Sequence, residues 1–491
     1  MPNLEYVSSD LKDKGFGSKS TGAVGGPFVF LCLILIWSPL PLASNRPAIW
    51  GANAILVAVL LIWTTLWGNS RPRAGGVPLG RIWFPATAFF AVAGWLALQA
   101  LPFAPAVLIH PAWDEAARVL GAPIAGSISV TPADTLIMLL RFLTYGAFFW
   151  CALQLTRSWR RALLLVYVFF AMTIVYAIYG LVLDAIQSTT ILWYEKWTYL
   201  DVVTATFVNR NAFAAFAGSG CIAGIALLFR RMRNARSRFP EDRIKTFIMM
   251  SSEFISTSGL IIAGVLVLFV ALVLTGSRAG LISTMLGLGV FVIFGAGRRA
   301  GGVMAVVSGL AVVVVLATAL ALSGDLVAGR FLSTAENWET RRLLFEGTIN
   351  AINDRPLLGY GGGSFIDVFG LYMPDAIGSQ FQFRRAHNTY LELALELGVP
   401  MATLLIGGFL ALGVRLFIGV RRRRDRYWLP ALALSVGFLF AVHSLVDFPL
   451  QMQANTFVFL ALLAAGVAQS WRRDELADKR TRAKIPNSIS A

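Results

Sequence analysis

Long apolar runs dominate this chain of 491 residues and restrict it to very few folds. A membrane-spanning helix needs about 20 mostly apolar residues, and about twelve runs of this kind occur along the chain. The sequence therefore predicts an all-α integral membrane protein with about 12 transmembrane helices. The runs lie near residues 28–43, 48–67, 83–101, 136–155, 162–186, 212–229, 258–275, 279–294, 303–322, 399–420, 428–445 and 455–470.

The scarcity of charge supports this fold class. Only 14% of the residues are charged, whereas a soluble domain carries roughly 25%. The first run follows a polar tail, so we interpret it as a retained span and not as a cleaved signal peptide. Pro39 and Pro41 predict that this span kinks or breaks near its outer end. The cysteines lie inside apolar runs without metal-ligand spacing, and we expect them to be small core residues: Cys32, Cys151 and Cys221.

The basic residues indicate how the chain is oriented in the membrane. If the N-terminus is cytoplasmic, 29 of the 42 Lys and Arg residues fall on the cytoplasmic side. This bias matches the positive-inside rule and predicts that both ends of the chain are cytoplasmic. The net charge of +16 then reflects topology, so we expect no nucleic-acid partner. Arg141 lies inside the fourth run, and we expect its side chain to snorkel outward.

Five parts make up the expected organisation. They are a cytoplasmic N-terminal tail (1–27), nine transmembrane helices (28–322), a large periplasmic loop (323–398), three more transmembrane helices (399–470) and a cytoplasmic C-terminal tail (471–491). A loop as long as this one is uncommon unless it is functional. Within it, residues 336–353 and 388–397 have helical patterns, and Gly398 and Pro400 are expected to end the second helix.

Two other outer connections are also long. Residues 102–134 are rich in proline and are expected to form a partly ordered loop. Residues 187–211 are rich in aromatic side chains that are expected to form a belt at the membrane surface: Trp193, Tyr194, Trp197 and Tyr199.

Four polar clusters fall on the predicted outer side of a chain that otherwise avoids polarity. Guanidinium groups there suit a phosphate-bearing ligand because they make paired hydrogen bonds and keep their charge. A neutral histidine beside them could accept a proton from an attacking hydroxyl. The clusters are Asn209, Arg210 and Asn211; Arg278, in a tight turn; Arg384, Arg385, His387 and Asn388; and His443, Ser444 and Asp447.

Each cluster also has an ordinary structural interpretation. An outer arginine can face solvent or lipid headgroups, and a histidine at a helix start can cap the helix or pack against it. His443 can hydrogen-bond a neighbouring helix. Glu392 and Glu396 lie four residues apart on one helix face, which favours a solvated face over a cation site. The coincidence of four clusters on one side favours a functional site.

From about residue 200 to residue 470, the chain resembles the bacterial O-antigen ligase and O-antigen polymerase superfamily. Five motifs carry the resemblance, and their order and spacing around a long outer loop make the set specific. Before residue 200, only the apolar spans match. The motifs are TFVNRNAFA (206–214), GSRAGL (276–281), DRPLLGYGGGSF (354–365), AHNTYLELALELG (386–398) and HSLVDFPLQMQAN (443–455).

The resemblance implies an inverting, metal-independent glycosyltransferase that needs no cofactor. Its donor would be a glycan on undecaprenyl diphosphate, presented at the periplasmic face of the bacterial inner membrane. Arg210 and Arg278 would hold the diphosphate, and His387 would activate the acceptor hydroxyl. We expect the other cluster residues to be secondary contacts to phosphate or glycan: Arg384, Arg385, Asn209, Asn211, Asn388, His443 and Asp447.

Three functions follow as hypotheses. The leading one is an O-antigen ligase-like enzyme of lipopolysaccharide biosynthesis that uses a lipid A-core or similar sugar as acceptor. The second is an O-antigen or exopolysaccharide polymerase, whose acceptor is another lipid-linked glycan, and the shared motifs barely separate the two. The third is a non-catalytic polysaccharide transporter. A transporter would be expected to have polar or broken helices near the membrane midplane, whereas these clusters fall at the outer ends of the spans.

Overall fold

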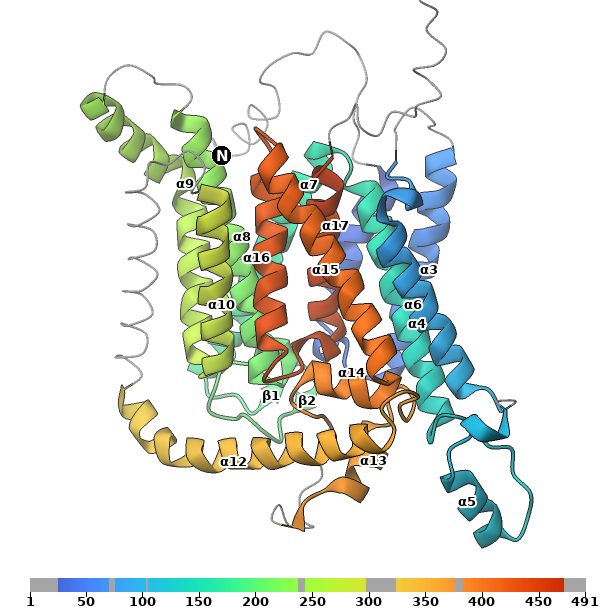
Figure 1. Cartoon of the computed structure of the whole chain (residues 1–491). Helices are drawn as coiled ribbons and strands as arrows, with labels where there is room; N and C mark the ends of the chain where they lie inside the picture. The colour runs from blue at the N-terminus through green and yellow to red at the C-terminus, as the bar shows by residue number, and fades with distance from the viewer. Residues whose placement is uncertain are drawn as a thin grey trace, which may run out of the picture.

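The computed structural model describes residues 25–69, 76–102, 105–236, 243–296, 324–375 and 383–471. These residues are mostly helical, and the long helices stand side by side in one bundle (Figure 1). Seven of the described helices are long and apolar enough to cross a membrane, and four shorter apolar helices accompany them. This supports an all-α membrane fold. The count of 12 is not confirmed, because the run near 303–322 lies outside the described residues.

Eleven of the predicted runs each coincide with one helix of the bundle. Helices that are joined by short connections point in opposite directions (Figure 1). The helices are α2 (Gly26–Trp37), α3 (Pro47–Asn69), α4 (Trp83–Ala100), α6 (Pro132–Leu155), α7 (Trp159–Ala185), α8 (Arg210–Arg236), α9 (Arg243–Leu274), α10 (Arg278–Phe291), α15 (Val399–Arg422), α16 (Trp428–His443) and α17 (Gln453–Gln469).

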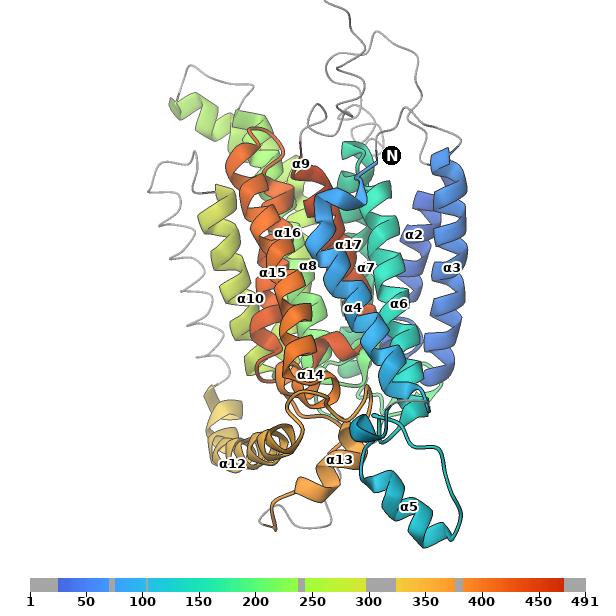
Figure 2. The ribbon, with the colours of Figure 1, turned by 45° about the vertical axis from the view of Figure 1, so that its right-hand side comes forward.

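The other helices and a hairpin gather at one end of the bundle, which we call the loop end (Figures 1 and 2). They are α5 (Ala112–Leu120), α12 (Gly324–Asp354), α13 (Phe365–Tyr372), α14 (Thr389–Leu397), and an antiparallel hairpin of β1 (Thr190–Ile191) and β2 (Tyr194–Glu195). Short 3-10 turns occupy Leu42–Ser44, Leu79–Ile82, Ala106–Leu108, Ala205–Phe207 and Pro449–Gln451, and a π-helical turn, Val292–Ala296, follows α10.

Helix α17 forms the centre of the bundle, and all of its residues are buried. Polar side chains of this helix bond to neighbouring elements: Asn455 Nδ2 donates to Ala212 O at 2.9 Å, and Gln469 Nε2 donates to Thr156 O at 2.8 Å. Such bonds fix helix positions where lipid offers no hydrogen-bond partners. Helices α8 and α10 approach closely because Gly280 lies against Ala214.

The first predicted span ends early, as expected. Helix α2 stops at Trp37, and the chain then turns through Leu42, Ala43 and Ser44, all of which have positive φ. The cysteines are buried, as predicted. The aromatic belt at the membrane surface stays a prediction: Trp193 and Trp197 are 72% and 75% exposed, whereas the ring of Tyr199 packs against Arg210.

The helices within the long loop match their predicted ends, with one exception. Helix α12 stops at Asp354 and α14 stops at Leu397. Gly398 has φ +78° and forms the corner that follows α14, a conformation that favours glycine. Pro400 does not end a helix, because it lies in the first turn of α15. Proline is tolerated there since the first backbone N–H groups of a helix have no partner within it.

Arg141 does not snorkel, so that expectation was wrong. Its side chain is buried within the bundle. Its Nη2 donates to Gln451 O at 2.8 Å, and its guanidinium lies 4.1 Å from the centroid of the Trp50 ring. A carbonyl and an aromatic face satisfy the charge inside the protein, so the side chain need not reach the membrane surface.

Candidate functional site

The loop before α14 aims His387 at the end of α16. Asn388 caps α14 by accepting hydrogen bonds from Tyr390 N and Leu391 N, which fixes where the helix begins. His387, one residue earlier, has φ +49°, a conformation that costs energy for a residue with a side chain. Its Nδ1 lies 3.1 Å from Asp447 Oδ1, and its side chain is 26% exposed. Asp447 thus orients the ring while part of His387 remains accessible.

The charge state of Asp447 determines which nitrogen of His387 carries a proton. Burial alone would raise the pKa of Asp447, but the hydrogen bond from His387 and the positive charges around it hold that pKa below its usual value. An ionised carboxylate can only accept a hydrogen bond. Nδ1 of His387 therefore donates, and Nε2 keeps a lone pair that can take up a proton.

Three further hydrogen bonds join α14 to the end of α16. Thr389 N donates to Ser444 O at 2.9 Å, and Thr389 Oγ1 donates to Asp447 O at 3.1 Å. Tyr390 OH donates to Ala441 O at 2.8 Å. The AHNTYLELALELG and HSLVDFPLQMQAN motifs therefore form one unit at the loop end, although α15 and most of α16 separate them along the chain.

The prediction of a solvated face for Glu392 and Glu396 was wrong, because both side chains are buried. Glu392 Oε1 accepts from Arg385 Nη1 at 2.8 Å and from Gln451 Nε2 at 3.0 Å. Its second oxygen accepts from Ala386 N at 3.1 Å. Arg385 is thereby committed to an ion pair within the protein, which makes it a poor candidate for a phosphate contact.

Arg210 and Arg278 open neighbouring helices at the same end of the bundle. Each is the first residue of its helix, α8 and α10 respectively. Ser277 Oγ donates to Asn211 Oδ1 at 2.7 Å, so the two helix starts are bonded directly. Asn209 Oδ1 accepts from Ala212 N at 2.9 Å. Helix N-termini attract anions through their backbone N–H groups, and an arginine on each adds a full positive charge.

Tyr199 lies close to Arg210 and is also within electrostatic range of Asp447, the partner of His387. Its ring centroid lies 5.3 Å from the Arg210 guanidinium. Burial and then the negative charge of Asp447 raise the pKa of Tyr199, while the positive charges of Arg210 and Arg341 oppose this. Tyr199 therefore lies within electrostatic range of both clusters. Arg341 comes from α12, and its Nη1 donates to Val446 O at 3.1 Å, beside Asp447.

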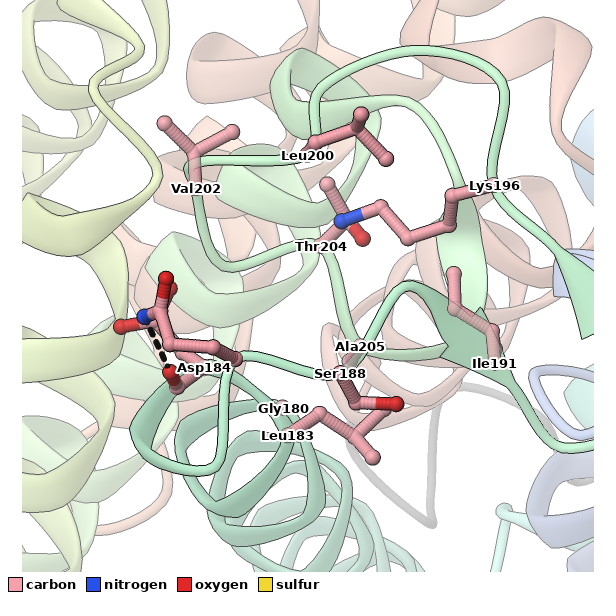
Figure 3. Close-up of a pocket in the computed structure, with 11 residues that line it drawn as sticks. Gly180, Leu183, Asp184, Ser188, Ile191, Lys196, Leu200, Val202, Thr204 and Ala205 are labelled. Carbon is pink, nitrogen blue, oxygen red and sulfur yellow. Dashed lines mark hydrogen bonds between the residues drawn. The ribbon is translucent and has the colours of Figure 1, made fainter.

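A hollow of about 310 Å³ opens beside Arg210 and is lined by that residue and by residues 197–202. This is within the size range of small-ligand sites, roughly 300–1,000 Å³. A second cavity shares Leu200 and Val202 with the first but holds only about 10 Å³, about the space of one water molecule. Figure 3 shows the buried Lys196 side chain extending toward Thr204 at this smaller cavity.

The remaining predicted residues have mixed positions. Arg384 is exposed at the loop end. His443 is fully buried near Asp447, and its ring nitrogens have no hydrogen-bond partner among the described groups. Asn209, Asn211 and Asn388 are engaged in the local contacts given above, which are structural. Within the described ranges, no three His, Cys, Asp or Glu side chains gather as metal ligands would.

Sequence reasoning missed Tyr199, Arg341 and Gln451. Tyr199 was expected to lie in the aromatic belt, and a helical pattern alone gave Arg341 no special role. Gln451 is part of the HSLVDFPLQMQAN motif, but its bond to Glu392 spans 59 positions. The positive φ of Tyr199 is a feature of the fold and has no signature in sequence.

The fold and the site define a multi-pass helical membrane protein with a polar site at one end of its bundle. The family model described as O-antigen ligase matches residues 263–406, and this match confirms the resemblance to the O-antigen ligase superfamily. The matched residues include Arg278 and His387, whereas Arg210 and Asp447 lie outside them. No curated protein matches the chain. The family implies lipid-linked glycan substrates and an activity of the ligase or polymerase type.

Proposed function

We propose that this protein transfers a glycan from undecaprenyl diphosphate to a sugar hydroxyl of a lipid A-core or similar acceptor, at the periplasmic face of the bacterial inner membrane. One observation carries the proposal. His387, oriented by Asp447 at 3.1 Å, lies at the same end of the bundle as the helix-start arginines Arg210 and Arg278. A base and a diphosphate site are the two parts that such a transfer requires.

In the proposed reaction, the acceptor oxygen attacks the anomeric carbon of the donor sugar. A bond forms between that oxygen and the carbon, and the bond between the carbon and the phosphate oxygen breaks. The hydroxyl proton passes to Nε2 of His387, and the electron pair of the broken bond leaves with undecaprenyl diphosphate. Attack opposite the leaving group inverts the anomeric centre. The cleaved sugar–diphosphate bond supplies the driving force.

In this reaction, Arg210 and Arg278 bind the leaving group. The departing diphosphate gains negative charge as the bond breaks, and fixed positive groups stabilise that charge in the transition state. The adjoining starts of α8 and α10 add backbone N–H donors, whose partial positive charge also attracts the diphosphate. These groups can neutralise the leaving group without a metal ion, so we propose a metal-independent reaction.

The periplasmic orientation rests on the separation of charges along the bundle. The end opposite the loop end carries the basic connections, such as Arg157, which donates to Ala468 O at 2.9 Å, and Arg233, which pairs with Asp425 at 3.2 Å. The positive-inside rule assigns such an end to the cytoplasm. The proposed site then faces the periplasm.

A reconstituted assay tests this function and separates it from polymerisation. The purified protein is placed in liposomes with an undecaprenyl-diphosphate-linked glycan, and either a lipid A-core or a second lipid-linked glycan is offered as acceptor. The proposal predicts glycan transfer to the lipid A-core. Transfer only between lipid-linked glycans would instead establish a polymerase. Correctly inserted protein that transfers to neither acceptor would contradict both enzymatic functions.

A further inference from the structure

The hollow beside Arg210 has an aromatic wall. Five of its seven lining residues are Trp197, Thr198, Tyr199, Asp201 and Arg210. Trp197 is 75% exposed, so its ring face is available to a ligand in the hollow. Thr198 and Asp201 contribute oxygen atoms that can bond to hydroxyl groups. The hollow therefore combines flat apolar faces with hydrogen-bonding groups.

The hollow adjoins the proposed diphosphate site through Arg210, and its Tyr199 is within electrostatic range of the pair that holds the proposed base. Arg210 forms one side of the hollow and also stacks on Tyr199. Tyr199 in turn lies within electrostatic range of Asp447, which binds His387. A donor whose phosphates contact Arg210 and whose anomeric carbon faces His387 would place its first sugar in this region.

Tyr199 is held there at a conformational cost. Its φ is +56°, a region that residues with a side chain rarely adopt and that is enriched at ligand sites. The ring is half-buried and packs against the Arg210 guanidinium. This strained backbone sets the position of Tyr199 in the wall of the hollow.

We propose that this hollow is the subsite for the sugar bonded directly to the donor diphosphate, and that Trp197 and Tyr199 bind its ring. This inference rests on the proposed function, and it identifies the part of the site that recognises the donor sugar. Sugar C–H groups carry partial positive charge and fit the negative face of an aromatic ring. The ring hydroxyls find partners in Thr198 and Asp201. About 310 Å³ is enough for one sugar, and the open side of the hollow leaves room for the rest of the glycan to extend outward.

The test compares two ligands by direct binding. One is undecaprenyl diphosphate bearing a glycan, and the other is undecaprenyl diphosphate alone. The wild-type protein should bind the glycan-bearing lipid more tightly. Trp197→Leu should reduce that preference by about threefold to tenfold and leave the affinity for the bare lipid within twofold. Tyr199→Leu should reduce the preference by a similar factor and also weaken binding of the bare lipid, because the Tyr199 ring packs on Arg210.

Matched variants separate this role from general damage. Tyr199→Phe keeps the aromatic face and should retain the preference. Trp193→Leu removes an equally exposed tryptophan of the same hairpin region that does not line the hollow, and should behave as wild type. Equal weakening of both ligands by Trp197→Leu would assign the hollow to lipid or phosphate and overturn the inference. A wild-type protein without preference for the glycan-bearing lipid would also overturn it.

Failure of the inference is distinguishable from failure of the proposed function. Glycan transfer by the wild-type protein is measured separately in the same liposomes. Transfer without any effect of Trp197 or Tyr199 on the binding preference refutes only the sugar subsite. A glycan preference that depends on both residues, in a protein that transfers nothing, supports the subsite and refutes the transferase.

Discussion

His387 Nδ1 lies 3.1 Å from Asp447 Oδ1, although 60 positions separate the two residues in sequence. Helices α15 and α16 run the length of the bundle and back between them. The pairing depends on the membrane-spanning fold, because α14 is bonded to the end of α16 through Thr389 and Tyr390. The loop can therefore hold His387 against the end of the bundle without being a domain of its own.

Replacing Asp447 with Asn should impair catalysis more than binding. Asparagine keeps the shape of the side chain but removes the charge that favours the Nδ1–H tautomer of His387. We expect kcat to fall by about 10²- to 10⁴-fold, with donor affinity nearly unchanged. Steady-state transfer kinetics measure both quantities. Asp367→Asn, at an exposed position of α13, is the control. A wild-type kcat in Asp447→Asn would refute the orienting role.

Replacing Arg278 with Ala should weaken donor use. The change removes one positive charge from the start of α10, and a charge-assisted contact to phosphate is worth about 1.5–3 kcal/mol. We expect the apparent donor affinity to fall by at least tenfold, and Arg278→Lys should restore it only partly because lysine lacks the paired donors. Equilibrium binding of undecaprenyl diphosphate reports the effect. Arg118→Ala, on the exposed helix α5, should change nothing, and unchanged binding in Arg278→Ala would exclude the diphosphate role.

Breaking the Arg385–Glu392 pair should loosen the loop. Glu392→Ala leaves Arg385 and Gln451 without the carboxylate that joins them. Removing one partner of a buried pair costs about 3–5 kcal/mol, and the partial exposure of Arg385 places this case at the lower end. Thermal unfolding in detergent should show a lower midpoint. In the double variant Arg385→Met with Glu392→Leu, much of the stability should return. If Glu392→Ala unfolds at the wild-type temperature, the pair does not anchor the loop.

Glu396 should make the protein less stable as pH rises. Burial, reinforced by the neighbouring charge of Glu392, raises the pKa of Glu396 to about 8. The unfolded carboxyl titrates near 4.3, so between about pH 4.3 and about pH 8 the folded protein holds a proton that the unfolded chain has lost. The stability from this group is complete below about pH 4.3 and declines up to about pH 8.

Substitution of Glu396 by Gln should therefore flatten the pH dependence of stability in that window. Unfolding midpoints at pH 5, 6.5 and 8 give the slope for each protein. Glu115→Gln, on the exposed surface of α5, should keep the wild-type slope. A slope that survives in Glu396→Gln would assign the titration to another group.

Local patterns in the sequence predicted much of the fold. Apolar runs located eleven helices, and Asn388 and Gly398 marked the limits of α14, because helix caps depend on a few adjacent residues. The prediction that Pro400 ends a helix was wrong, since a proline that follows one helix is equally suited to the first turn of the next. Local rules cannot tell how soon a new helix begins.

Burial of charge could not be predicted from spacing alone. Glu392 and Glu396 have the spacing of a solvated face, yet their surroundings include Arg385 and the distant Gln451. Arg141 was misjudged for the same reason, because the Gln451 carbonyl that accepts its hydrogen bond lies 310 positions away. The candidate residues could be identified in the sequence as polar side chains in a mostly apolar chain. Their pairing could not be identified, because it depends on contacts that only the folded bundle supplies.

The most direct test of the proposed function is single-turnover glycan transfer by His387→Gln in liposomes with a saturating lipid-linked donor. His110→Gln serves as the matched control, since His110 lies in the outer connection before α5, away from the Asp447 pair. We predict that His387→Gln inserts normally, binds donor as the wild type does, and transfers glycan at least about 100-fold more slowly. Transfer at the wild-type rate by correctly inserted His387→Gln would contradict the assignment of His387 as the base.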